Sequence, residues 1–304
     1  MSRRDLLKAG AVASGAGFAE GPAAAAGAAR TPVTVRDRFW LWGHYEGSHN
    51  GDYGLPGNSR ITPVEAACYL SVPNVILVRY KGKPEPPFRQ YALPFRALRE
   101  VVWSVVGAGG ATASEERSRV LELTRQNPNF SGVMMDDFFR GGKEGKVAAL
   151  TVGELEALQR RLKTGPRKLD LWVVLYTHQL NDPVGEHLKH CDVVTLWTWK
   201  AADLGRLREN FEKAEEVAPA ARKVLGCYMW DYGDHKPMPV SSMQLQCKQG
   251  LRWLEEDRID GMIFLASCIS DLELETVEWT RGWIQQVGSR KLTAASPAKR
   301  GKRK

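Results

Sequence analysis

The fold of this chain is indicated by the stretch Ser131-Gly132-Val133-Met134-Met135-Asp136-Asp137-Phe138-Phe139. A short apolar run that is bounded by a glycine is typical of a buried strand. Two carboxylates follow where the strand meets its loop, and burying charged groups costs free energy unless they are paired. Because side chains alternate along a strand, we expect only one of Asp136 and Asp137 to point into a cavity. We interpret the stretch as a core strand that ends at a functional site.

Strand-like runs alternate with amphipathic helical patterns on both sides of this stretch, from about residue 38 to residue 287. Such alternation is typical of parallel β-α units. Thr62 with Glu65 and Thr151 with Glu154 form capping-box patterns, which predict where two of the helices begin. The expected strands lie at 39–42, 74–79, 101–106, 131–139, 169–176, 192–197, 223–229 and 260–265, and the expected helices follow them near 63, 88–99, 114–126, 152–163, 183–189, 202–217, 241–257 and 272–287.

Eight such units over residues 39–287 are close to the roughly 250 residues of a (β/α)8 barrel. The sequence therefore predicts the α/β class and a single (β/α)8 TIM barrel. The alternative is a doubly wound open sheet, which would show a glycine-rich phosphate turn after its first strand. The segment Trp42-Gly43-His44-Tyr45 does not have that pattern.

The two ends of the chain differ in composition from the part between them. Ser2-Arg3-Arg4-Asp5-Leu6-Leu7-Lys8 and the alanine-rich stretch after it resemble a bacterial twin-arginine export signal. The resemblance implies a signal peptide over 1–29 and a periplasmic or secreted protein. Seven basic residues lie in 289–304, which predicts a disordered basic tail after a barrel domain at 30–288.

Charge and hydropathy limit the classes of partner. The formal net charge of +8 is concentrated in the two ends, so the body gives no sign of nucleic-acid binding. No apolar run has the eighteen or so residues that would span a membrane. No two of the five cysteines have the spacing of a zinc site, and we expect neither a metal nor another cofactor. The oligomeric state is left open.

Polar and aromatic residues gather at the predicted carboxyl ends of the strands, where the active sites of such barrels lie. Carboxylates there are candidates for catalysis, because cleavage of a glycosidic bond needs one carboxyl group as acid and a second as nucleophile or base. Indole and phenol rings suit the C–H faces of sugars. The candidate catalytic residues are Asp136, Asp231, Asp137 and Glu46, and the candidate substrate-binding residues are Trp42, His44, Arg79, Tyr176, His178, Trp197, Trp199, Trp230 and Tyr232.

This arrangement resembles that of TIM-barrel glycoside hydrolases. The segment 132–138 is similar to a reduced form of the chitinase-type motif Asp-Gly-x-Asp-x-Asp-x-Glu, with Gly132 and Asp136 on its glycine and its last aspartate. Ser131, Met134 and Phe138 stand where that family has its other acids, so the family's mechanism is not carried over. Carboxylates after strands 4 and 7 also resemble a large clan that has glutamates at both places. The resemblance implies a glycosidase and a carbohydrate substrate.

Two alternatives stay open at this point. A metal-dependent hydrolase of the amidohydrolase type would use His44, His178, His235 and Asp136. The first strand, however, is followed by one histidine where that family has a His-x-His pair. The other alternative is a barrel that binds carbohydrate without cleaving it.

Overall fold

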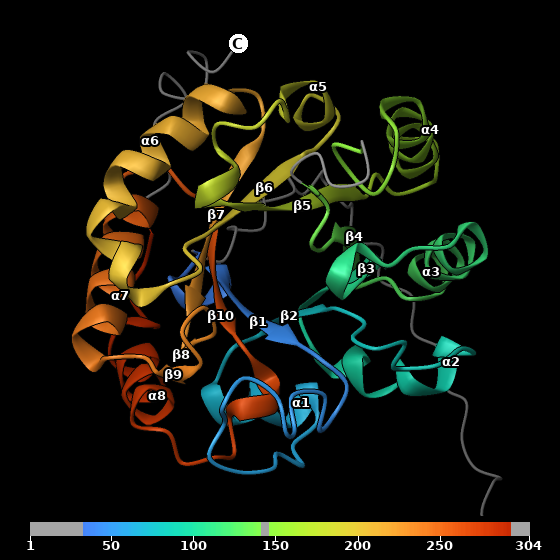
Figure 1. The fold of residues 1–304 in the computed structure, drawn as a ribbon. Coiled ribbons are helices and arrows are strands. Elements are labelled where there is room, and N and C mark those ends of the chain that lie inside the picture. The colour runs from blue at the N-terminus through green and yellow to red at the C-terminus, as the bar shows by residue number, and fades with distance from the viewer. Residues whose placement is uncertain (1–32, 141–145, 293–304) are drawn as a thin grey trace, which may run out of the picture. The chain divides into compact units, whose positions relative to one another are not determined.

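A computed structural model describes residues 33–140 and 146–292, and these form a closed barrel of eight parallel strands (Figure 1). Around the barrel the strands follow the order β1-β10-β7-β6-β5-β4-β3-β2, so the first and the last strand in the chain pair and close it. The predicted (β/α)8 barrel is confirmed. Its strands are β1 (Phe39–Gly43), β2 (Asn74–Leu77), β3 (Glu100–Val106), β4 (Phe130–Met135), β5 (Asp170–Tyr176), β6 (Val193–Trp197), β7 (Arg222–Tyr228) and β10 (Gly261–Leu265).

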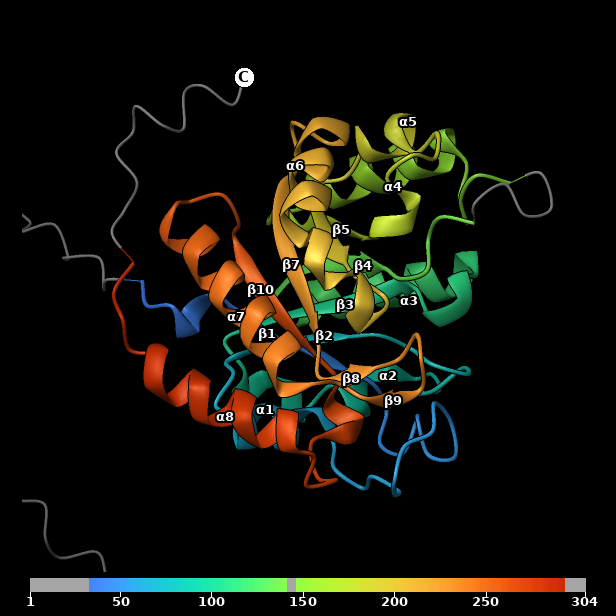
Figure 2. The same cartoon turned by 60° about the vertical axis from the view of Figure 1, so that its left-hand side comes forward.

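The helices surround the strands, as two views of the ribbon show (Figures 1 and 2). The hydroxyls of Thr62 and Thr151 accept the backbone N–H of Glu65 and Glu154, so both predicted capping boxes are present. Helix α7 follows Pro239 and has no side-chain cap. The helices are α1 (Pro63–Leu70), α2 (Phe88–Tyr91), α3 (Ser114–Gln126), α4 (Val152–Lys163), α5 (Gly185–Leu188), α6 (Leu207–Val217), α7 (Val240–Glu255) and α8 (Glu275–Val287).

Strand β4 lies between β3 and β5 and is almost fully buried. The glycine that bounds it in the sequence is required by this packing. A Cβ atom on Gly132 would lie 2.6 Å from the backbone oxygen of Asp170 and 2.9 Å from the indole nitrogen of Trp172. No other residue fits between these groups without displacing β5. The predicted core strand is therefore confirmed, and its end fixes the position of Asp136 and Asp137.

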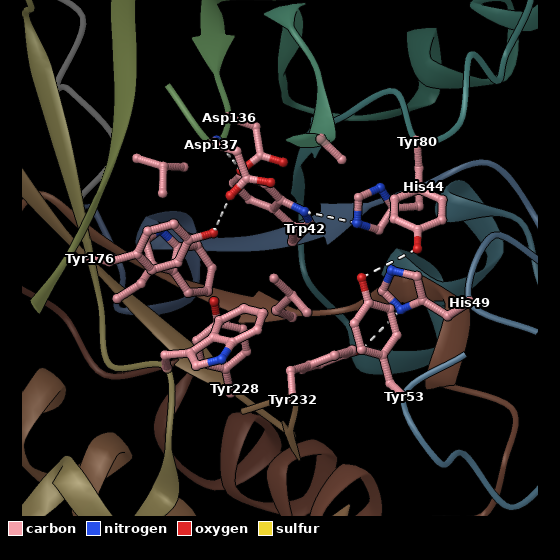
Figure 3. A pocket seen from close by; sticks show the side chains of 15 residues that line it. Trp42, His44, His49, Tyr53, Tyr80, Asp136, Asp137, Tyr176, Tyr228 and Tyr232 are labelled. Carbon is pink, nitrogen blue, oxygen red and sulfur yellow. Dashed lines mark hydrogen bonds between the residues drawn. The ribbon is translucent and has the colours of Figure 1, made fainter. Parts of the chain in front are cut away.

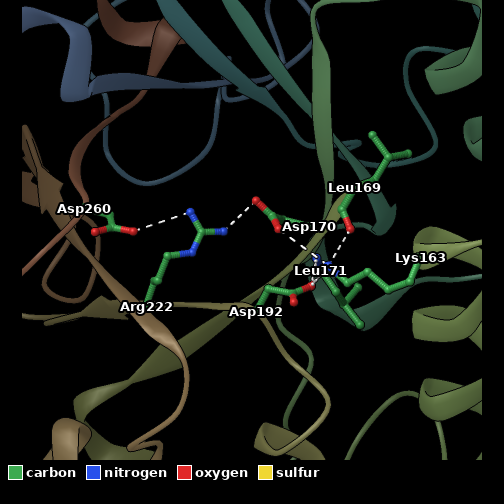
Figure 4. A network of polar contacts seen from close by, with 7 residues as sticks. All are labelled: Lys163, Leu169, Asp170, Leu171, Asp192, Arg222 and Asp260. Carbon is green, nitrogen blue, oxygen red and sulfur yellow. Dashed lines mark hydrogen bonds and ion pairs between the residues drawn. The ribbon is translucent and has the colours of Figure 1, made fainter. Parts of the chain in front are cut away.

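An ion-pair network joins the amino-terminal ends of the later strands (Figure 4). The guanidinium of Arg222 lies 2.5 Å from a carboxylate oxygen of Asp170 and 3.4 Å from one of Asp260. The ammonium of Lys163 lies 2.9 Å from Asp192, whose carboxylate also accepts the backbone N–H of Leu171. The network links four neighbouring strands, β5, β6, β7 and β10, at the end of the barrel where these strands begin.

Replacing Arg222 by methionine should lower the free energy of unfolding by about 1 kcal/mol, because networked but partly exposed ion pairs contribute at this level. Urea unfolding of the variant measures the change, and high salt should reduce the difference from the wild type. Arg206→Met is the matched control, because the Arg206–Glu209 pair is two-thirds exposed and should contribute little. Equal destabilisation by both variants would show that the network has no special role.

The first and last described segments pair with each other. The backbone N–H of Val35 donates to the oxygen of Arg290, and that of Leu292 donates to the oxygen of Val33. Residues 289–292 of the expected disordered tail are thus hydrogen-bonded, which corrects the start of that tail. The expected export signal and the rest of the tail lie outside the described residues. None of the helices in the described part is long and apolar enough to cross a membrane.

Candidate active site

A pocket with an empty volume of about 470 Å³ opens where the barrel strands end (Figure 3). The pocket is lined by residues at or after the ends of all eight barrel strands, including residues of the loop between β1 and α1. They are Trp42, His44, His49, Tyr53, Tyr80, Ala108, Asp136, Asp137, Val174, Tyr176, Trp197, Trp199, Tyr228, Tyr232 and Leu265.

Asp136 is the more deeply buried of the two adjacent carboxylates and is only 5% exposed. Its backbone N–H donates to the oxygen of Val106, which continues the pairing of β4 with β3 beyond the strand. Burial raises the pKa of the Asp136 carboxyl well above its ordinary value, and the neighbouring Asp137 carboxylate raises it further. Asp136 therefore holds a proton at pH values where an exposed aspartate has lost it.

Asp137 adopts a left-handed backbone conformation, with φ at 44°. This turn ends the alternation of the strand, so both aspartates line the pocket, and our expectation that only one would do so is wrong. The carboxylate of Asp137 accepts the hydroxyl of Tyr176 at 2.7 Å and the backbone N–H of Gly109 at 2.7 Å. The pair thus combines a buried carboxyl group of raised pKa with a neighbouring carboxyl group that is held by two hydrogen-bond donors.

Two histidines lie in the pocket wall as neutral imidazoles. Burial lowers the pKa of His44 to about 4 and that of His49 to about 2. Both ring nitrogens of His44 are engaged, one with the backbone oxygen of Val78 at 2.9 Å and the other with the indole N–H of Trp42 at 3.1 Å. His44 therefore orients Trp42 and has no nitrogen left for proton transfer or for a metal.

Aromatic rings form most of the remaining wall. The indole of Trp197 packs edge-on against Trp42, with ring centroids 5.2 Å apart, and lies 5.1 Å from the ring of Tyr228. Tyr53 and Tyr80 contribute hydroxyls that lie 3.2 Å from each other. Rings with hydroxyls at their edges offer apolar faces and hydrogen-bond partners together, as a polyhydroxylated ligand requires.

The structure brings most of the expected site residues together and leaves five of them outside the pocket lining. The residues it places in the pocket are Asp136, Asp137, Trp42, His44, Tyr176, Trp197, Trp199 and Tyr232. Those that do not line it are Asp231, Glu46, Arg79, His178 and Trp230.

Asp231 lies in the short hairpin of β8 (Trp230–Asp231) and β9 (Lys236–Pro237) and is fully buried. Its carboxylate accepts the backbone N–H groups of Asp234 at 3.2 Å and Ala201 at 3.3 Å. These bonds hold the hairpin against the segment after β6. The structure therefore places Asp231 as a loop anchor, and the carboxyl group beside Asp136 is Asp137.

The other four residues each have a partner that holds their side chain in place. The Arg79 guanidinium pairs with Glu116 and donates to the backbone oxygen of Pro84 at 3.0 Å. Glu46 accepts the hydroxyl of Tyr91 at 3.4 Å. The exposed His178 stacks on Tyr176, and the indole of Trp230 donates to the backbone oxygen of Tyr53 at 2.9 Å. Trp230 thereby fixes the loop that carries Tyr53 into the pocket.

Seven lining residues were not among the candidates, and four of them, namely His49, Tyr53, Tyr80 and Tyr228, have polar or aromatic side chains. Tyr228 is the last residue of β7 and Tyr80 follows β2, so the strand-end rule points to both, but neither was chosen as a candidate. His49 and Tyr53 lie in the long loop after β1, where no strand end predicts which side chains turn inward. Within the described residues no three His, Cys, Asp or Glu side chains converge to hold a metal.

The fold and the pocket define a (β/α)8 barrel with paired carboxyl groups at its active-site end. No protein-family model and no curated protein matches the chain. Solved structures of the same fold do match it. The spore cortex-lytic enzyme SleL of Bacillus megaterium QM B1551 superposes with a TM-score of 0.52 at 13% identity, over 88% of this chain and 77% of that one. The active domain 2 of a chitinase from Pyrococcus furiosus gives 0.50 at 13% identity, over 77% and 85%. At such identities the likeness shows the fold alone.

Proposed function

We propose that this protein is a glycoside hydrolase whose acid is Asp136, assisted by Asp137. The observation that supports this most is the pairing of a buried aspartate of raised pKa with a second aspartate, Asp137, in an aromatic pocket. Glycosidic cleavage needs two carboxyl groups in different protonation states. The likeness in fold to a chitinase agrees with this reaction class.

In the proposed reaction Asp136 gives its proton to the glycosidic oxygen. The bond between this oxygen and the anomeric carbon then breaks, and its electron pair stays with the leaving oxygen. Positive charge develops on the sugar ring, and the carboxylate of Asp137 stabilises it. A water molecule adds to the anomeric carbon and gives up a proton, which restores the acid.

The pocket wall supplies the groups that hold the sugar. The rings of Trp42, Trp197 and Trp199 offer flat apolar faces, and the hydroxyls of Tyr53 and Tyr80 lie at hydrogen-bonding distance from each other. The Tyr176 hydroxyl fixes the orientation of Asp137. Catalytic groups that are fixed in this way need no rearrangement when charge develops.

The test is a panel of nitrophenyl glycosides that covers the common sugars in both anomeric forms, assayed with the full chain. We expect release of nitrophenol from at least one of them, and we expect the reaction to continue after metal chelation. Failure to cleave any member of the panel, or of a matching set of oligosaccharides, would contradict the proposal.

The rate should depend on pH through Asp136. A general acid works only while it is protonated, so kcat/KM should be retained below the raised pKa of Asp136 and should fall as the pH rises through it. The alkaline limb should therefore lie well above the ordinary aspartate pKa of 3.8. The pH profile of kcat/KM measures this limb. A profile that is already falling near the ordinary value would exclude Asp136 as the acid.

A further inference from the structure

The pocket has an uncompensated negative charge. Of the fifteen described residues that line it, none is a lysine or an arginine, and the acidic residues are Asp136 and Asp137. Its two histidines are buried, and burial lowers the pKa of each to about 4 and about 2, so they carry no positive charge near neutral pH. A ligand in this pocket meets a carboxylate and no cation among these residues.

The partners of Asp137 are neutral. Its two oxygens accept the hydroxyl of Tyr176 and the backbone N–H of Gly109, both at 2.7 Å. In the part of the chain that the structure describes, neither Asp136 nor Asp137 belongs to an ion pair. A partly buried carboxylate without a counter-ion favours a cation that enters beside it.

Three cations near the rim of the pocket are paired with other carboxylates. The ammonium of Lys81 lies 2.7 Å from Asp52, and that of Lys200 lies 2.8 Å from Asp234. The guanidinium of Arg79 pairs with Glu116. These pairs reduce the positive potential that the three side chains would otherwise create at the pocket.

Eight aromatic rings surround this charge, and ring faces attract cations as well as C–H groups. Neutral sugars also stack on such rings, so the rings alone do not select a ligand. The carboxylate of Asp137 beside the rings makes the site selective, because a ring-lined site with a carboxylate and no cation favours an ammonium group. The rings belong to Trp42, Tyr53, Tyr80, Tyr176, Trp197, Trp199, Tyr228 and Tyr232 (Figure 3).

We propose that the sugar this pocket prefers carries a free, protonated amino group, which lies between the Asp137 carboxylate and the aromatic wall. Acetylation of the amine removes the charge and therefore the preference. Sugars with a carboxylate, such as uronic acids, are repelled by Asp137. This inference rests on the proposed glycosidase function and adds the chemical class of its substrate.

The test separates binding from cleavage. Binding of methyl glycosides of glucosamine, N-acetylglucosamine, glucose and glucuronic acid to the full chain is measured by titration calorimetry near neutral pH. We expect the glucosaminide to bind roughly tenfold or more tightly than the glucoside, and the glucuronide to bind least. Equal binding of the amine and hydroxyl sugars, or tightest binding of the glucuronide, would overturn the inference.

The variant Asp137→Asn tests whether the preference for an amino sugar depends on the carboxylate of Asp137. Asparagine tolerates the left-handed backbone at this position, so the variant should fold. We expect the glucosaminide and the glucoside to bind it equally. Asp203→Asn, which removes the same charge from an exposed site after β6, should keep the preference. An amine preference that survives in Asp137→Asn would overturn the assignment.

The same four sugars as nitrophenyl glycosides test the proposed function separately. If none is cleaved while the amine still binds preferentially, the glycosidase proposal fails and the charge preference of the pocket stands. If neutral glycosides are cleaved and the amine shows no advantage in binding or in kcat/KM, the inference fails and the glycosidase proposal stands.

Discussion

Asp136→Asn should lower kcat on glycosides by roughly a hundredfold to ten-thousandfold, which is the usual contribution of a general acid. Asparagine keeps the size of the side chain and an oxygen that can accept the N–H of Asp137, so the fold should be retained. The loss arises because the amide has no proton to give to the leaving oxygen. Steady-state kinetics measure kcat, and an unfolding curve of the same preparation shows whether the variant is folded.

The choice of leaving group provides an internal check on this variant. Glycosides of acidic phenols leave without being protonated, so Asp136→Asn should lose much less activity on them than on glycosides of alcohols. The control is Asp203→Asn, which makes the same replacement of aspartate by asparagine at an exposed site outside the pocket. This variant should behave as the wild type on both kinds of glycoside. If Asp136→Asn lost the same factor on every leaving group, Asp136 would have a role other than proton donation.

Gly226→Ala should lower the free energy of unfolding by roughly 3 kcal/mol, at the upper end of the usual cost of overpacking a core. A Cβ atom at this position of β7 would lie 2.1 Å from the indole ring of Trp197. Trp197 is 1% exposed and donates its indole N–H to Thr195, so it has little freedom to move aside. Because Trp197 also forms part of the pocket wall, substrate binding should weaken as well.

Gly282→Ala is the matched control for this substitution. Gly282 lies within α8, and a Cβ atom there would meet nothing within 4 Å. Alanine is the better helix former by about 1 kcal/mol, so this variant should be more stable than the wild type. Denaturant unfolding of the two variants should therefore give changes of opposite sign. A Gly226→Ala protein of unchanged stability would mean that Trp197 does not pack over β7 as described.

The fold could be predicted from the sequence because the local patterns of strands and helix starts are kept in the tertiary structure. Buried parallel strands read as apolar runs, and the capping boxes at Thr62 and Thr151 mark helix starts through bonds between neighbouring residues. The start of α6 was placed five residues too early, because residues 201–206 form a separate 3-10 turn and the helix that follows has no side-chain cap to detect.

The candidate site was predicted best where a side chain lies at the end of its strand or directly after it, as Trp42 and Asp136 do. Asp137 was misjudged because its left-handed backbone turns the second carboxylate inward, and strand alternation does not predict such a turn. Asp231 follows β7 in the chain, but it lies in the short hairpin of β8 and β9, where its carboxylate accepts backbone N–H groups. His49 and Tyr53 reach the pocket through a long loop whose path depends on contacts with Trp230 and Tyr232.

The most direct test of the central claim is hydrolysis in water labelled with oxygen-18, followed by mass spectrometry of both products. If the pocket breaks a glycosidic bond as proposed, one labelled oxygen should appear at the anomeric carbon of the released sugar and none in the leaving alcohol. The label should disappear from the products when Asp136→Asn is used with an alcohol glycoside. Label in the leaving group, or label in the sugar that forms equally fast with Asp136→Asn, would contradict the account.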